Sequence, residues 1–135
     1  MARFSLTEYD QRVRVYHMKF KIDSPHLLAV IHIEDEYTIY KYEADDDMLF
    51  ETHAVTFDPR YYHIMNLHED CPGIDHIGIV HYLSGIFFQW GIHILYVNTF
   101  AYNLIFIEEE DITRVRILLH ENESILFSAS FNADI

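Results

Sequence analysis

The amino-acid sequence predicts an α+β protein with an antiparallel sheet, and three observations favour this class. From Tyr61 onward, short β-branched runs alternate with two segments whose apolar residues recur at helical spacing. Before Tyr61, many apolar and aromatic residues alternate with polar ones, as in half-buried strands. Half of the 135 residues are apolar, so the chain can bury a sizeable core without disulfides.

The first half of the chain is expected to consist mainly of strands. A short helix is also expected over His26–Val30, because Ser24 can cap it and Pro25 suits the first helical position. The run Asp45-Asp46-Asp47 indicates a solvated turn or the start of a helix. The strands predicted in this half and at its end are Arg12–Phe20, Tyr37–Tyr42, His53–Phe57 and Tyr61–Leu67.

The second half has a clearer pattern. Apolar residues from Gly78 to Trp90 follow the three-and-four spacing of an amphipathic helix, and Gly91 suits the left-handed residue that ends it. Acidic residues at 109–111 favour the positive end of a second helix. The predicted strands are Ile92–Val97, Leu104–Ile107 and Ile125–Phe131, with a hairpin or tight loop over Asn98–Asn103.

From Tyr61 the predicted order is strand, helix, strand, strand, helix, strand. A βαββαβ order gives a four-stranded antiparallel sheet with both helices on one face, which is the ferredoxin-like arrangement. The other face of such a sheet needs a partner. The first half of the chain supplies further strands and a short helix.

The net charge indicates which classes of binding partner the protein is not expected to have. Nine Lys and Arg stand against 22 Asp and Glu, a net charge of −13, so neither nucleic acid nor a membrane surface is an expected partner. The single cysteine, Cys71, cannot form an intramolecular disulfide. No apolar run has the length of a membrane span, and the first ten residues lack a signal peptide's apolar core. We therefore expect a cytoplasmic protein.

Three consecutive segments carry a resemblance to a known family. They are the glycine-bounded helix Gly78–Gly91, the strand Ile92-His93-Ile94-Leu95-Tyr96-Val97-Asn98-Thr99-Phe100, and Asn103-Leu104-Ile105-Phe106-Ile107 followed by Glu109-Glu110-Asp111-Ile112. In this order they resemble the ACT-like domain of the CASTOR cytosolic arginine sensors and their short bacterial relatives. Upstream, Gln11–Val15 and Glu36–Ile39 resemble two further strands of these sensors more weakly.

The resemblance implies both an organisation and a function. Residues 1–57 would form a reduced ACT-like half, and residues 58–135 an ACT-like βαββαβ domain. The implied function is a non-enzymatic sensor, without cofactor, that binds a small molecule such as an amino acid where two units meet. Because this chain matches only one half of a sensor, the shared site implies a homodimer, with a regulatory protein as a further partner. The alternative is a ligand-free protein-interaction module that uses the same sheet.

The resemblance also implies a set of ligand-binding residues. Gly78 lies where unpaired N–H groups at a helix start can hold a carboxylate, although it can equally permit close packing. The polar residues can bind a ligand or be satisfied internally. Asn103 replaces the family's aspartate, which weakens the case for arginine. The full set is Ile77, Gly78, Ile92, His93, Ile94, Asn98, Thr99, Phe100 and Asn103.

Other reactive residues give weaker signals. The ten histidines include no His-x-x-x-His pair, so no metal site is predicted from spacing. Cys71 precedes Pro72-Gly73 without a recognisable base or oxyanion donor, and no phosphate-binding glycine motif is present. The acidic run from Glu108 to Asp111 is expected to be a solvated helix start. No catalytic residue is predicted, and the protein is not expected to be an enzyme.

Overall fold

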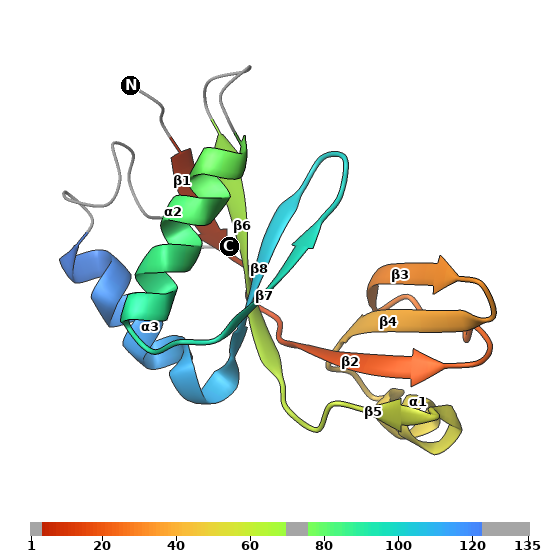
Figure 1. The fold of residues 1–135 in the computed structure, drawn as a ribbon. Coiled ribbons are helices and arrows are strands. Elements are labelled where there is room, and N and C mark those ends of the chain that lie inside the picture. The colour runs from red at the N-terminus through yellow and green to blue at the C-terminus, as the bar shows by residue number, and fades with distance from the viewer. Residues whose placement is uncertain (1–3, 70–75, 123–135) are drawn as a thin grey trace. The chain divides into compact units, whose positions relative to one another are not determined.

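The computed structural model describes residues 4–69 and 76–122, and in this part of the chain it shows strands with antiparallel pairings and three helices (Figure 1). The predicted α+β class with an antiparallel sheet is therefore confirmed. The chain divides into two compact units. We call Gln11–Tyr62 the N-terminal unit, and the described residues within Met1–Asp10 and His63–Ile135 the C-terminal unit.

The N-terminal unit is a small antiparallel sheet covered by one helix. Strand β4 lies between β2 and β3, and the short strand β5 pairs with the other edge of β2. Phe50 of the helix is buried against Tyr16, Met18 and Ile39 of the sheet. The elements are β2 (Val13–Met18), β3 (Leu27–Ile33), β4 (Glu36–Tyr42), α1 (Asp47–His53) and β5 (Thr56–Phe57).

Two predicted elements of this unit are wrong. The helix expected over His26–Val30 is replaced by strand β3, because the Ser24 hydroxyl accepts the His26 N–H at 3.0 Å in a local turn and the apolar run that follows pairs with β4. The strand expected over His53–Phe57 is reduced to the two residues of β5, because α1 continues through His53.

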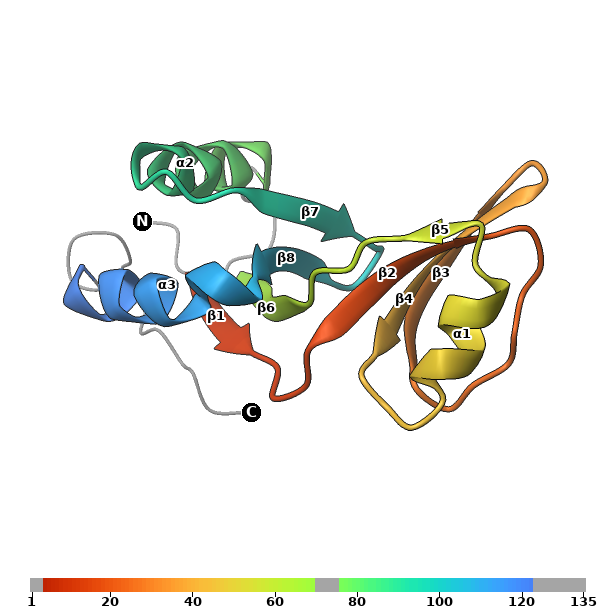
Figure 2. The same cartoon turned by 90° about the horizontal axis from the view of Figure 1, so that it is seen from below.

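The C-terminal unit contains four strands in the order β1, β6, β8, β7 and two helices. Apolar residues of both helices pack on the same face of this sheet (Figure 2). The shared core contains Leu83 and Phe87 of the first helix, Val115 and Leu119 of the second helix, and Ile107 of the sheet. The elements are β1 (Phe4–Glu8), β6 (Tyr62–Glu69), α2 (His76–Gln89), β7 (Ile94–Asn98), β8 (Asn103–Glu108) and α3 (Glu109–Glu121).

The first strand of the chain was not predicted, and it changes the division of the chain. β1 pairs antiparallel with β6, with Leu6 opposite Leu67, so the first ten residues group with the C-terminal unit and not with a half spanning residues 1–57. β1 thus lies beside β6, where a βαββαβ unit would place its last strand. The strand predicted over Ile125–Phe131 lies outside the described residues.

The helix ends of the C-terminal unit follow local chemistry. Gly91 has a φ of +72°, the left-handed conformation expected after a helix, and its N–H donates to Phe88 O at 3.0 Å. Three acidic residues occupy the first turn of α3, as predicted. Within residues 4–69 and 76–122, no helix is both long and apolar enough to cross a membrane.

Candidate functional site

The predicted ligand-binding residues fall in three places of the C-terminal unit. Ile77 and Gly78 lie in the first turn of α2, which begins at His76 rather than at Gly78. Ile92 and His93 directly precede the strand β7, which begins at Ile94. The other four, Asn98, Thr99, Phe100 and Asn103, form the hairpin that connects β7 with β8.

The residues at the start of β7 divide between core and solvent. Ile92 is buried, and its N–H donates to Phe87 O at 2.9 Å. Ile94 packs partly buried against the same core, whereas His93 between them is exposed. This follows from the alternation of side chains along an extended chain. Ile92 and Ile94 therefore contribute to packing under the helices.

The hairpin brings Asn98, Thr99 and Asn103 together. Asn98 pairs with Asn103 in the last register position of the two strands. The Thr99 N–H donates to Tyr102 O at 2.9 Å, and the Thr99 hydroxyl accepts the Tyr102 N–H at 3.0 Å. Phe100 at the tip is fully exposed. The turn is thus held by its own hydrogen bonds while it presents an aromatic ring to solvent.

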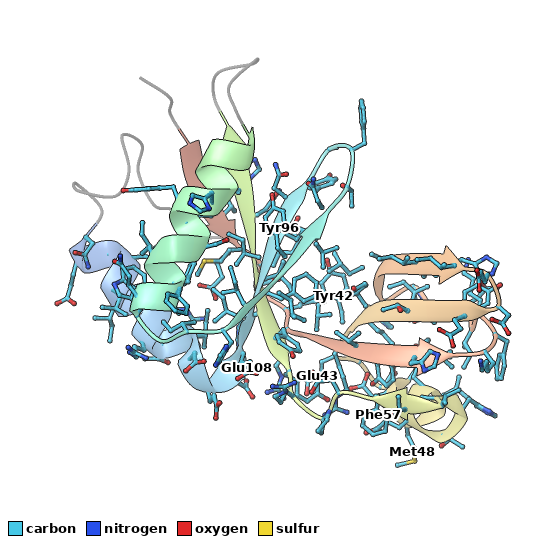
Figure 3. All side chains as sticks on the ribbon, viewed as in Figure 1. Tyr42, Glu43, Met48, Phe57, Tyr96 and Glu108 are labelled. Atoms are coloured by element: carbon cyan, nitrogen blue, oxygen red, sulfur yellow. The ribbon has the colours of Figure 1, made fainter. Side chains whose placement is uncertain are left out.

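Asn103 is satisfied within the chain. Its side-chain oxygen accepts a hydrogen bond at 3.1 Å from the hydroxyl of Tyr96, which is labelled in Figure 3. Its side-chain amide donates to Leu67 O at 3.4 Å. Its backbone N–H donates to the side-chain oxygen of Asn66 at 3.2 Å. One side chain thereby joins β6, β7 and β8, which is the usual fate of a partly buried amide.

Asn66 is a central member of this cluster that the sequence prediction missed. It is 3% exposed and lies in β6 between the buried residues Met65 and Leu67. The Tyr9 phenol is hydrogen-bonded to the Asn66 side chain, and burial and the neighbouring Tyr102 raise the pKa of Tyr9 despite that bond. An asparagine within the short apolar run Ile64–Leu67 was the available signal, because a buried amide requires partners.

A second polar cluster joins β1, β6 and α3. The buried Glu8 carboxylate accepts two hydrogen bonds from the Arg116 guanidinium, one of them at 2.8 Å from Nε. His63 lies between two carboxylates, with Nδ1 at 3.9 Å from Glu8 and Nε2 at 3.5 Å from Glu109. The hydrogen bonds that Arg116 donates to Glu8 raise the pKa of Arg116. This cluster links Glu109 and Arg116 of α3 to the strands β1 and β6.

One group of possible metal ligands occurs in the part of the chain that the structure describes. Glu108, Glu110 and Asp111 place one carboxylate oxygen each within 4.8 Å of one another. Glu108 is buried, and Glu110 is exposed. Acidic residues at a helix start commonly form such a group without an ion, because the helix dipole stabilises them. The group contains no histidine.

Comparisons with known proteins give the fold alone. No family model matches the sequence, and no curated protein matches it. A crystal structure of the protein Atu0741 from Agobacterium tumefaciens is similar, with a TM-score of 0.66 and 18% identity over 98% of this chain and 95% of that one. A protein of unknown function from Vibrio cholerae, VC0802, described as a possible transport protein, has a TM-score of 0.64 and 10% identity over 87% of this chain and 88% of its own.

Proposed function

We propose that this protein is a non-enzymatic ACT-like interaction module that associates with another protein chain through its C-terminal unit. The observation that carries the proposal is the distribution of charge. Residues 76–107 contain no Asp, Glu, Lys or Arg, in a chain where these make up 23% of residues. The segment comprises α2, β7 and all of β8 except its last residue, Glu108.

The uncharged segment contributes side chains to the surface as well as to the core. Within residues 81–107, five large apolar or aromatic side chains are exposed, with exposed fractions from 42% to full exposure: Tyr82, Phe88, Leu95, Phe100 and Tyr102. Four of the five are aromatic. The central parts of protein–protein interfaces are depleted of charged residues and enriched in aromatic ones. An exposed surface with this composition is typical of a binding surface rather than of a freely solvated one.

The ferredoxin-like arrangement and the ACT-like family are part of the proposal. The order β6, α2, β7, β8, α3 supports them, together with the packing of both helices on one face. In this interpretation β1 completes the sheet beside β6. A cytoplasmic location and a regulatory partner follow from the resemblance to the arginine sensors.

A second candidate function is an amino-acid sensor with its ligand at a subunit interface. The polar groups of Asn98 and Thr99 at the exposed hairpin favour it. The internal hydrogen bonds of Asn103 weigh against it, because a ligand would have to replace Tyr96 and Leu67 as partners. Interaction through the uncharged segment is therefore the better supported function.

Thermal unfolding in the presence of each of the twenty amino acids, at millimolar concentration, separates the two functions. A ligand that binds only the native protein raises the melting temperature. We expect no amino acid to shift it. A reproducible increase with one amino acid, abolished by Asn98→Ala but not by Lys19→Met in the N-terminal unit, would replace the interaction module with the sensor.

A further inference from the structure

The outward surface of α2 forms one continuous stripe. From position 81 onward its exposed residues are His81, Tyr82, Gly85, Phe88 and Gln89, which lie on one side of the helix because each of the other four is three or four positions from Gly85. Leu83 and Phe87 on the opposite side are buried in the core. Tyr82 is 44% exposed and Phe88 is 83% exposed. We call these five residues the α2 stripe.

Within residues 4–69 and 76–122, no contact explains the glycine in the middle of this stripe. Gly85 does not adopt a left-handed conformation, and a Cβ placed on it would meet nothing within 4 Å. Glycine is the weakest helix former after proline, so an interior helical glycine without a packing role lowers helix stability. A glycine between two exposed aromatic residues suits a surface where another backbone approaches closely.

Helix α3 shows what an ordinary outward surface looks like in the same unit. Its exposed residues include Glu109, Glu110, Arg114 and Glu121, so charge is distributed along its length. It also exposes one large apolar side chain, Ile117, at 53%. The two helices cover the same sheet, and only α2 lacks charge on its outer side.

We infer that the α2 stripe is the contact surface for a second copy of this chain, with the two α2 helices antiparallel and crossing at Gly85. The argument is the symmetry of the stripe. Tyr82 and Phe88 lie three positions before and after Gly85, and His81 and Gln89 lie four positions before and after it. A two-fold axis through Gly85 therefore places Tyr82 against Phe88 of the other copy, and His81 against Gln89.

Charge supports the same occupant. Each copy carries a net charge of −13, so two copies repel unless their contact surface is free of acidic residues. The α2 stripe meets this condition, and its aromatic and amide groups complement one another in pairs. The inference rests on the proposed interaction function and names its partner.

The test is the dissociation constant of the dimer, measured by sedimentation and by light scattering on the full chain. Phe88→Glu introduces a carboxylate against Tyr82 of the other copy and should raise the constant by about 100-fold, because both symmetric contacts are lost. Ile117→Glu on α3 is the matched control and should change it by less than about twofold. Circular dichroism establishes that both variants are folded.

Two further variants test the geometry. Tyr82→Lys combined with Phe88→Glu should recover at least about tenfold of the lost affinity, since the antiparallel arrangement brings the new charges together between copies. Gly85→Ala should weaken the dimer by blocking the close approach, while it raises the melting temperature of the dilute monomer because alanine favours the helix. A merely structural glycine would not give opposite signs in the two measurements.

The outcomes are distinct. Loss of the dimer with Phe88→Glu, retention with Ile117→Glu and recovery in the double variant support the inference. A wild-type dimer that Phe88→Glu leaves intact overturns the α2 stripe as its interface. A wild-type monomer at all concentrations and salt levels overturns the second copy as partner. The proposed function fails separately, through an amino acid that raises the melting temperature.

Discussion

Charged side chains are used differently in the two units. In the N-terminal unit, ion pairs surround β2 and β4: Arg12 with Glu43, Arg14 with Glu51, and Lys41 with Asp46 and Asp47. In the C-terminal unit, the 32 consecutive residues 76–107 include no Asp, Glu, Lys or Arg. Charged residues are therefore distributed unevenly between these two parts of the protein.

The physical consequences of the two arrangements differ. The free energy that a partly buried ion pair contributes to stability depends on pH. Removing one partner is destabilising because it leaves the other charge uncompensated. The free energy gained by covering an uncharged surface depends on the apolar area that is removed from water. The N-terminal unit should therefore be sensitive to single charge removals and to acid, whereas the uncharged segment should respond to introduced charge.

The largest effect is expected at Lys41. Its side chain is fully buried, with Nζ at 2.6 Å from Asp46, in contact with Asp47, and at 2.9 Å from Tyr42 O. Lys41→Met leaves two carboxylates without their cation, and removing one partner of a buried pair costs about 3–5 kcal/mol. Urea unfolding followed by circular dichroism measures the loss.

The control for this prediction is Lys19→Met. Lys19 is half-exposed and lies at 3.4 Å from Glu36, so its removal should cost less than about 0.5 kcal/mol. Fluorescence of Trp90, the single tryptophan, reports on the other unit. Equal losses for the two lysine variants would contradict the central role of the buried ion pair.

A smaller effect is expected at Asn103, within the C-terminal unit. Asn103→Asp replaces the amide that donates to Leu67 O with a carboxylate, so two oxygens face each other without a proton. The free energy of unfolding should fall by about 2 kcal/mol. Urea unfolding followed by Trp90 fluorescence measures this.

The matched control is Asn98→Asp, at the opposite position of the same hairpin. Asn98 is exposed, so its substitution should change stability by less than about 0.5 kcal/mol. A stable Asn103→Asp protein that binds a cationic amino acid would reverse the interpretation, because it would show that the position faces a ligand.

Much of the fold could be predicted from sequence where the periodicity was long. The apolar spacing through Leu83 and Phe87 predicted α2, and the short β-branched runs around Asn98–Asn103 predicted the β7–β8 hairpin; both are confirmed. The failures lie in short segments. Leu27–Ile33 was assigned partly to a helix because Ser24-Pro25 imitates a helix start, and pairing with β4 overrides that local preference.

Two features were inaccessible to local reasoning. β1 contains five residues, and only its pairing with β6, far along the chain, makes it a strand. The site residues were proposed from a linear motif, which cannot tell that Ile92 is covered by the core while Phe100 projects into solvent. The partners of Asn103 come from two strands, and two of them, Asn66 and Leu67, lie outside the motif.

The smallest expected effect is the loss of stability in acid that should follow from protonation of Asp58 in the N-terminal unit. Burial opposes ionisation of Asp58, but hydrogen bonds from Arg60 and Tyr62 outweigh it and lower the pKa of Asp58 from 3.8 to about 2. A carboxyl group whose pKa is lower in the folded state stabilises the protein above its unfolded pKa, and this contribution disappears as the pH falls through the folded value.

The stability difference between wild type and Asp58→Asn should therefore depend on pH. Asparagine imitates the protonated carboxyl, so the difference should be largest above about pH 5 and should close as the pH falls from about 4 to 2. Its size should be on the order of 1 kcal/mol, since Asp58 is partly exposed and Arg60 mostly so. Urea unfolding of both proteins at each pH gives the difference. A gap that stays constant would mean that the Asp58 bonds to Arg60 and Tyr62 do not distinguish the ionised group from the neutral one. The acid sensitivity expected of the N-terminal unit would then have to come from its other ion pairs, Arg12–Glu43, Arg14–Glu51 and Lys41 with its two aspartates.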